Sequence, residues 1–123
     1  MEMRKEQKCE NRINEHLESR LEDINKMYEA GYYMEDDKVS EDLKEELPGL
    51  YNYGLCIDEV KAGTFKGQRE NYKRWQLGWG GPSDEFRIYE NGEVEYWFLD
   101  WFDGASRELN RRDADMIKGI INI

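Results

Sequence analysis

Residues 75–102 read WQLGWGGPSDEFRIYENGEVEYWFLDWF and hold all four tryptophans of the chain. Within this stretch, Asn91 and Gly92 separate two runs in which apolar and polar residues alternate. Alternation of this kind is typical of β-strands. An Asn-Gly pair between two such runs favours a two-residue hairpin, because a type I′ turn needs positive φ at both central positions. We therefore expect an antiparallel hairpin formed by residues 85–90 and 93–102.

A two-residue turn at positions 91 and 92 would fix which residues of the hairpin face one another. It places Glu90 opposite Glu93, and the pairing continues as Tyr89–Val94, Ile88–Glu95, Arg87–Tyr96, Phe86–Trp97 and Glu85–Phe98. Because neighbouring residues of a strand point to opposite faces, this register also sorts the side chains. The expected core face carries Phe86, Ile88, Trp97, Leu99 and Trp101. The second face carries Arg87, Tyr89, Val94, Tyr96 and Phe98 and reaches Asp100.

The first half of the chain has the pattern of helices. Residues 3–28 contain neither Pro nor Gly, and apolar residues recur at helical spacing at Ile13, Leu17, Leu21, Ile24 and Tyr28. This predicts one long amphipathic helix that ends near Gly31 and packs on a sheet. Ser40 has the character of an N-cap, so we expect a short second helix that Pro48 and Gly49 stop.

Two further strands and a last helix complete the expected fold. Residues 50–60 alternate with Tyr51, Tyr53, Leu55 and Ile57 on one side, and residues 72–79 place Trp75, Leu77 and Trp79 on one face. Residues 113–115 precede an apolar run and indicate a short C-terminal helix. The sequence thus predicts an α+β fold, with a four-stranded antiparallel sheet, a long N-terminal helix and short helices packed mainly on one face. We expect a single domain, 1–123, with an acidic helical region (1–49), an antiparallel sheet (50–106) and a C-terminal helix (107–123).

Charge and cysteine content restrict the classes of partner. The chain of 123 residues has a net charge of −10, and residues 1–61 carry 9 basic and 17 acidic residues. Such a field repels nucleic acid backbones and anionic membranes and attracts basic protein surfaces. Cys9 and Cys56 belong to no metal-binding motif, and the charged start of the chain does not have the pattern of a signal peptide. We expect a cytoplasmic protein with no cofactor, no membrane association and no direct contact with nucleic acid.

Three sets of residues are of types that take part in catalysis or ligand binding. Asp84, Glu85, Asp100 and Asp103 lie near one end of the hairpin and offer oxygen ligands for Mg²⁺ or Ca²⁺ or an acid/base pair, which leaves a small metal-dependent enzyme as an alternative. His16, the only histidine, has no Ser or Cys at a spacing that indicates a triad. Gly78, Gly80 and Gly81 lead into Pro82 instead of a helix, so they do not form a phosphate-binding loop.

A resemblance adds to this reading. The blocks YGLCIDEV, YKRWQLGWGGPSDEFRIY and VEYWFLDWFDGAS, with Gly63-Thr64-Phe65 between the first two, resemble a family of small proteins carried on plasmids, integrative elements and phages. The resemblance covers residues 53–106, and the block at 79–87 is its most specific part. Cys56 and Gly78 depart from the family pattern, which has a small or polar residue such as Ser at these places. The resemblance implies an accessory protein found with anti-defence functions, such as anti-CRISPR or antirestriction, and supplies no catalytic residues.

These observations favour a non-enzymatic acidic inhibitor or interaction protein that binds a basic surface of a host defence protein. Tyr, Trp and Arg are enriched at the energetic centres of protein interfaces, which directs attention to the second face of the hairpin and its ends. The expected partner-binding residues are Trp79, Asp84, Glu85, Arg87, Tyr89, Tyr96, Asp100 and Asp103. Inhibition by nucleic-acid mimicry and inhibition by another contact stay open, as does a purely structural accessory protein that forms a homodimer.

Overall fold

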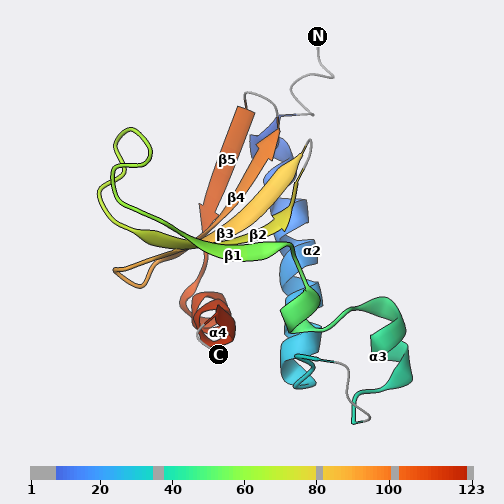
Figure 1. The fold of residues 1–123 in the computed structure, drawn as a ribbon. Coiled ribbons are helices and arrows are strands. Elements are labelled where there is room, and N and C mark those ends of the chain that lie inside the picture. The colour runs from blue at the N-terminus through green and yellow to red at the C-terminus, as the bar shows by residue number, and fades with distance from the viewer. Residues whose placement is uncertain (1–7, 35–37, 80–81, 101–102, 122–123) are drawn as a thin grey trace.

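The structure, a computed structural model, describes residues 8–34, 38–79, 82–100 and 103–121 (Figure 1). It is an α+β fold with one antiparallel sheet of five strands in the order β1-β2-β3-β4-β5. The elements along the chain are α2 (Cys9–Glu29), α3 (Glu41–Glu46), the 3₁₀ helix η1 (Leu50–Asn52), β1 (Cys56–Val60), β2 (Tyr72–Gly78), β3 (Ser83–Tyr89), β4 (Val94–Asp100), β5 (Asp103–Glu108) and α4 (Arg111–Ile121).

The long N-terminal helix and the antiparallel sheet are confirmed, and the expectation of four strands is wrong. The fifth strand, β5, pairs with β4 and places Ala105 opposite Phe98. Its sequence, DGASRE, does not alternate large apolar residues with polar ones, so it lacks the usual pattern of a strand. Ala105 is the residue that it buries in the core. The strand expected at 50–60 begins only at Cys56. Residues 50–52 form a 3₁₀ turn, and glycines at positions 49 and 54 have positive φ, which breaks the extended chain.

The hairpin between β3 and β4 has a different register from the one expected. Tyr89 donates its N–H to the carbonyl of Glu93, and Gly92 donates to the carbonyl of Tyr89, so the loop has three residues and not two. Gly92, with φ of 94°, has the left-handed conformation, as in the usual three-residue loop with a bulge. As a result Phe86 pairs with Tyr96 and Ile88 with Val94.

This shift by one residue exchanges the two faces of β4. Tyr96 and Phe98 turn into the core and are fully buried, while Trp97 and Leu99 turn to the opposite face. The core face expected from the sequence is therefore wrong for its β4 residues, and Trp101 lies outside the described residues. The new register also brings the phenol of Tyr96 onto the same face as Asp84, which pairs with Phe98.

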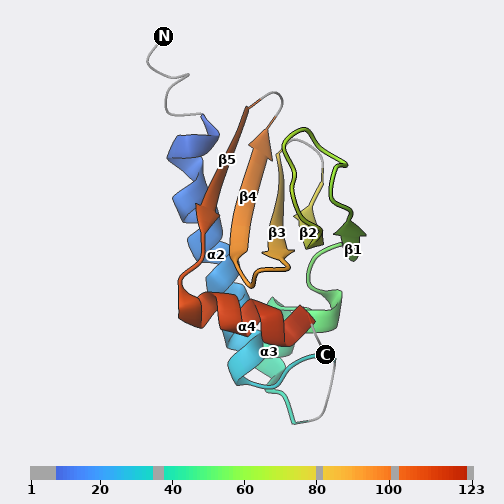
Figure 2. The same ribbon diagram turned by 90° about the vertical axis from the view of Figure 1, so that its left-hand side faces the viewer.

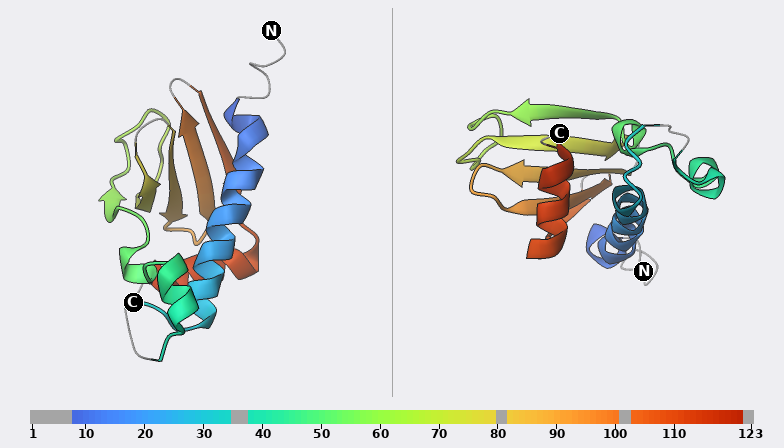
Figure 3. Two further views of the ribbon diagram at one scale, coloured as in Figure 1. Left: turned by 90° about the vertical axis from the view of Figure 1, so that its right-hand side faces the viewer. Right: turned by 90° about the horizontal axis from the view of Figure 1, so that it is seen from below.

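Helix α2 packs against one side of the sheet, and α4 lies below the ends of the strands (Figures 2 and 3). Figure 3 shows α2 lying against one face of the sheet, and Figure 2 shows the opposite face, which α2 does not cover. We call the covered side the inner face; its buried residues include Trp75, Phe86, Val94, Tyr96 and Phe98. We call the other side the open face; it carries Tyr72, Arg74, Glu85, Arg87, Tyr89, Glu95 and Trp97.

The helices match the sequence signals to different degrees. In α2, Ile13 and Ile24 are buried as expected, but Met27 takes the place that the periodicity gave to Tyr28, which is 40% exposed. In α3, the side chain of Ser40 accepts a hydrogen bond from the N–H of Leu43, so the expected N-cap is confirmed. That helix buries none of its residues and lies away from the sheet (Figure 1).

The loop geometry gives a prediction for two glycines. Replacing Gly92 by Ala should cost about 1 kcal/mol, because a residue with a side chain is strained at positive φ, while the new methyl group meets only the Nζ of Lys118, at an ordinary contact distance of 3.7 Å. The same replacement at Gly119, inside α4, should stabilise the protein by about 1 kcal/mol, because Ala favours the helix. Urea unfolding of both variants measures the two changes. Equal effects at both positions would contradict the left-handed conformation of Gly92.

Candidate functional site

The eight residues expected to bind a partner do not form one surface. Asp84 and Tyr96 lie on the inner face, and Asp100 and Asp103 contact the start of α2. Trp79 is 62% exposed just beyond the end of β2. Glu85, Arg87 and Tyr89 lie together on the open face.

Asp84 is the centre of a buried polar network between α2 and the sheet. Its carboxylate accepts two hydrogen bonds from Arg20, at 2.7 Å from Nε and 3.0 Å from Nη2. It accepts a third from the hydroxyl of Tyr96, at 2.6 Å. Burial, together with this bond to Asp84, raises the pKa of Tyr96 far above its ordinary value. Asp84 and Tyr96 are thus occupied by contacts within the fold.

Asp100 and Asp103 attach the first turns of α2 to the sheet. Arg12 contacts the carboxylate of Asp100 at 2.6 Å, and Asp103 accepts a hydrogen bond from the N–H of Cys9 at 2.7 Å. That bond lowers the pKa of Asp103, because it favours the charged carboxylate.

The four carboxylates considered as metal ligands do not form one group, although Asp100 and Asp103 are opposite each other on β4 and β5. Asp84 points to the inner face and Glu85 to the open face, since they are neighbours on one strand. In the part of the chain that the structure describes, no three His, Cys, Asp or Glu residues are grouped so that they could hold a metal ion.

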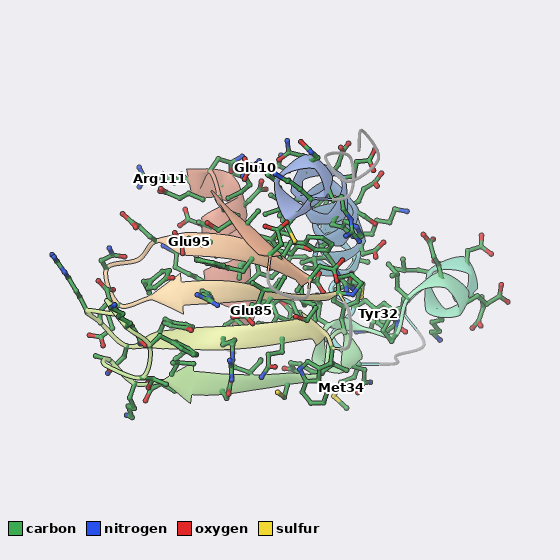
Figure 4. All side chains as sticks on the ribbon, turned by 90° about the horizontal axis from the view of Figure 1, so that it is seen from above. Glu10, Tyr32, Met34, Glu85, Glu95 and Arg111 are labelled. Carbon is green, nitrogen blue, oxygen red and sulfur yellow. The ribbon has the colours of Figure 1, made fainter. Side chains whose placement is uncertain are left out.

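The open face has its own polar network around Arg87. The Nε of Arg87 contacts Glu85 at 2.7 Å, and its guanidinium lies 4.0 Å from the ring centre of Trp97 and 5.1 Å from that of Tyr72. Beside it, Glu95 accepts hydrogen bonds from the hydroxyl of Tyr89 at 2.6 Å and from the indole N–H of Trp97 at 2.9 Å. Burial and the bond to Glu95 raise the pKa of Tyr89 to about 12. Figure 4 shows Glu85 and Glu95 on the sheet, apart from Glu10 in the first turn of α2.

A pocket of about 530 Å³ lies between this network and the connection from β1 to β2. Residues 65–70 of the connection form one wall, and Tyr72, Arg87, Tyr89, Glu95 and Trp97 form the floor. Tyr72 is only 3% exposed, and its buried hydroxyl has no hydrogen-bond partner among the described residues. Sequence reasoning missed this pocket, because Trp97 was assigned to the core and residues 61–71 contain few large apolar residues.

The outward side of α2 forms a second surface. Glu15, Glu18 and Glu22 are exposed, and none of them forms an ion pair with another described residue. They are three and four residues apart, so they follow one side of the helix over about 10 Å. The arginines of the same helix, Arg12 and Arg20, turn towards the carboxylates of the sheet.

Comparison with known protein families, with curated proteins and with solved structures finds no match for this chain. The resemblance to a mobile-element family therefore stays a prediction. Among the described residues, no helix combines the length and the apolar character needed to cross a membrane.

The inner network predicts a difference between two bidentate ion pairs. Asp84→Ala should lower the free energy of unfolding by about 3 kcal/mol or more, because it leaves Arg20 and the hydroxyl of Tyr96 without their acceptor. Asp58→Ala removes the exposed pair with Arg74 and should cost less than about 1 kcal/mol. Denaturant unfolding compares them, and equal losses would contradict the structural role of Asp84.

The hydroxyl of Tyr72 gives a second stability prediction. Tyr72→Phe should stabilise the protein by about 1 kcal/mol, since the hydroxyl is buried without a partner and its removal takes away a desolvation cost. Tyr96→Phe is the matched control and should destabilise the protein by about 1 kcal/mol or more, because it breaks the bond to Asp84. Thermal unfolding measures both changes, and a destabilised Tyr72→Phe variant would refute the interpretation.

Proposed function

We propose that this protein is a non-enzymatic interaction protein that binds a basic surface of a partner protein through the outward side of α2. The observation that supports this proposal is the separation of charge on that helix. Arg12 and Arg20 pair with carboxylates of the sheet, while Glu15, Glu18 and Glu22 are exposed and form no ion pair with a described residue, although Lys26 and Arg112 lie near Glu22. The excess negative charge is therefore concentrated where a partner can reach it.

A surface of this kind acts mainly through association rate and selectivity. Clustered charge of one sign steers a complementary partner during diffusion and repels partners of like charge. The nearby helix α3 carries Asp42 and Glu45, which are both exposed and increase the negative potential of this surface. A basic nucleic-acid channel of a host defence protein has the charge that this surface complements, and the choice of such a target rests on the resemblance described above.

The open face takes no part in this docking. It lies on the opposite side of the sheet from α2, so one flat partner surface does not contact both (Figures 2 and 3). The expectation that Arg87 and Tyr89 anchor the partner beside the acidic surface is thus replaced by docking through α2.

Charge neutralisation tests the proposal. The protein is immobilised, proteins from a host lysate are captured at low salt, and the binding of each purified candidate is then measured. Glu15→Gln, Glu18→Gln and Glu22→Gln combined should weaken binding of the true partner by about tenfold or more, and about 1 M salt should abolish it. The control combines Glu90→Gln, Glu93→Gln and Glu108→Gln, which change the net charge equally but lie on the sheet and its hairpin.

The outcomes separate the alternatives. Loss of binding in both triple variants would show that only net charge matters, and unchanged binding in the α2 variant would refute the proposal. Competition by duplex DNA for the captured partner would indicate nucleic-acid mimicry, whereas binding alongside DNA would indicate another contact.

A further inference from the structure

The pocket on the open face has a composition that differs from the acidic surface around it. Its lining contains Lys66, Arg69 and Arg87 as well as Glu70, Glu93 and Glu95, so it is formally neutral in a chain with a net charge of −10. Two of these carboxylates already have donors. Glu95 accepts from Tyr89 and Trp97, and Glu70 accepts from the N–H of Asn91. Lys66 and Arg69 are exposed and form no ion pair with a described residue. The charged groups of the lining that have no described partner are therefore two cations, Lys66 and Arg69, and one carboxylate, Glu93.

The pocket is lined mainly by planar side-chain groups. Phe65 lies on the loop side, and Tyr72, Tyr89 and Trp97 lie on the floor, with the planar guanidinium of Arg87 between two of the rings. Aromatic and guanidinium planes stack on planar ligands. The volume of about 530 Å³ is that of a site for a small organic molecule and is too large for a single ion.

The hydroxyl of Tyr72 indicates which polar group such a ligand carries. It is buried without a partner, which is costly unless a hydrogen bond is made in another state of the protein. A tyrosine hydroxyl carries its proton at neutral pH, and burial raises the pKa of Tyr72 further, so the hydroxyl can donate to an acceptor oxygen. The charges around this hydroxyl are mixed, because Arg87 and Arg74 lower its pKa while Glu85 and Asp58 raise it, so the preference for an anion rests on Lys66 and Arg69.

We propose that the pocket between residues 65–70 and the open face binds a small planar anion, an aromatic ring system that carries a phosphate or a carboxylate. The ring lies against Trp97 and Phe65, and the anionic group is held by the hydroxyl of Tyr72 with Lys66 and Arg69. This site is independent of the proposed function, because it uses the face of the sheet opposite to α2.

Titrations followed by NMR test the proposal. AMP and indole-3-acetate are the two probes, one with a phosphate and one with a carboxylate, and adenosine and inorganic phosphate are the controls. Either probe should shift the indole N–H signal of Trp97 and the amide signals of residues 65–70. Adenosine and phosphate alone should bind at least about tenfold more weakly, because each lacks one of the two recognised parts. Comparing the probes tells which anionic group is preferred.

Variants connect the binding to named residues. Tyr72→Phe should weaken binding by about tenfold even though the fold is intact, and Tyr51→Phe, an exposed tyrosine outside the pocket, should leave it unchanged. Lys66→Gln with Arg69→Gln should also weaken binding, whereas Arg111→Gln with Arg112→Gln, an equal charge change on α4, should not. The proposal is overturned if neither probe shifts these signals up to millimolar concentration, or if Tyr72→Phe binds them equally well. Equal binding of inorganic phosphate would overturn the role of the ring.

Discussion

Arg20 and Asp84 form a bidentate ion pair between α2 and β3, and the phenol of Tyr96 on β4 completes the contacts of the carboxylate. A buried carboxylate is stable only when its oxygens have donors, so the three groups must be positioned together. This requirement joins the helix to two neighbouring strands at one point. Around it, the fully buried side chains of Phe86, Phe98 and Ile24 supply the nonpolar contact between the layers.

The same pair determines how charge is distributed on the surface. A helix with mixed charges has no strong field if its cations and anions are equally exposed. Here the guanidinium groups of Arg12 and Arg20 are used on the inner side, by Asp100 and Asp84, and the glutamates of the outward side form no ion pair with a described residue. A structural interaction inside the protein therefore produces an acidic exterior. The net charge of the chain does not by itself reveal this arrangement, because it depends on which side of α2 meets the sheet.

The long amphipathic helix and most strands can be predicted from local sequence, because the spacing of the apolar residues shows which positions are buried. The register of the hairpin does not follow in this way. Asn91-Gly92 is compatible with a two-residue loop and also with a three-residue loop in which Gly92 has positive φ. The choice depends on which of Tyr96 and Trp97 is better buried on the inner face, and Asp84 decides it by offering an acceptor to Tyr96. That is a tertiary contact between residues 12 positions apart, which no local pattern contains.

The candidate site could not be predicted from the sequence for a similar reason. Arg87 and Tyr89 were recognised as unusual, but the residues that surround them come from separate segments. Tyr72 lies on the neighbouring strand, and Phe65 to Glu70 come from a connection whose composition is typical of a loop. Only the pairing of β2 with β3 and of β3 with β4 brings them to one face.

The two ion pairs of β3 have different consequences, although they are formed by adjacent residues. The pair at Asp84 takes its cation from another layer and thereby fastens α2 to the sheet. The pair between Glu85 and Arg87 joins two residues of one strand, so it connects no layers. Burying such a pair costs desolvation without a gain in tertiary structure. Together with the rings of Tyr72 and Trp97 it does, however, hold the guanidinium in a fixed orientation beside the pocket. Fixed polar groups of this kind reduce the ordering cost of binding, which is the physical reason to regard the open face as a place for a ligand.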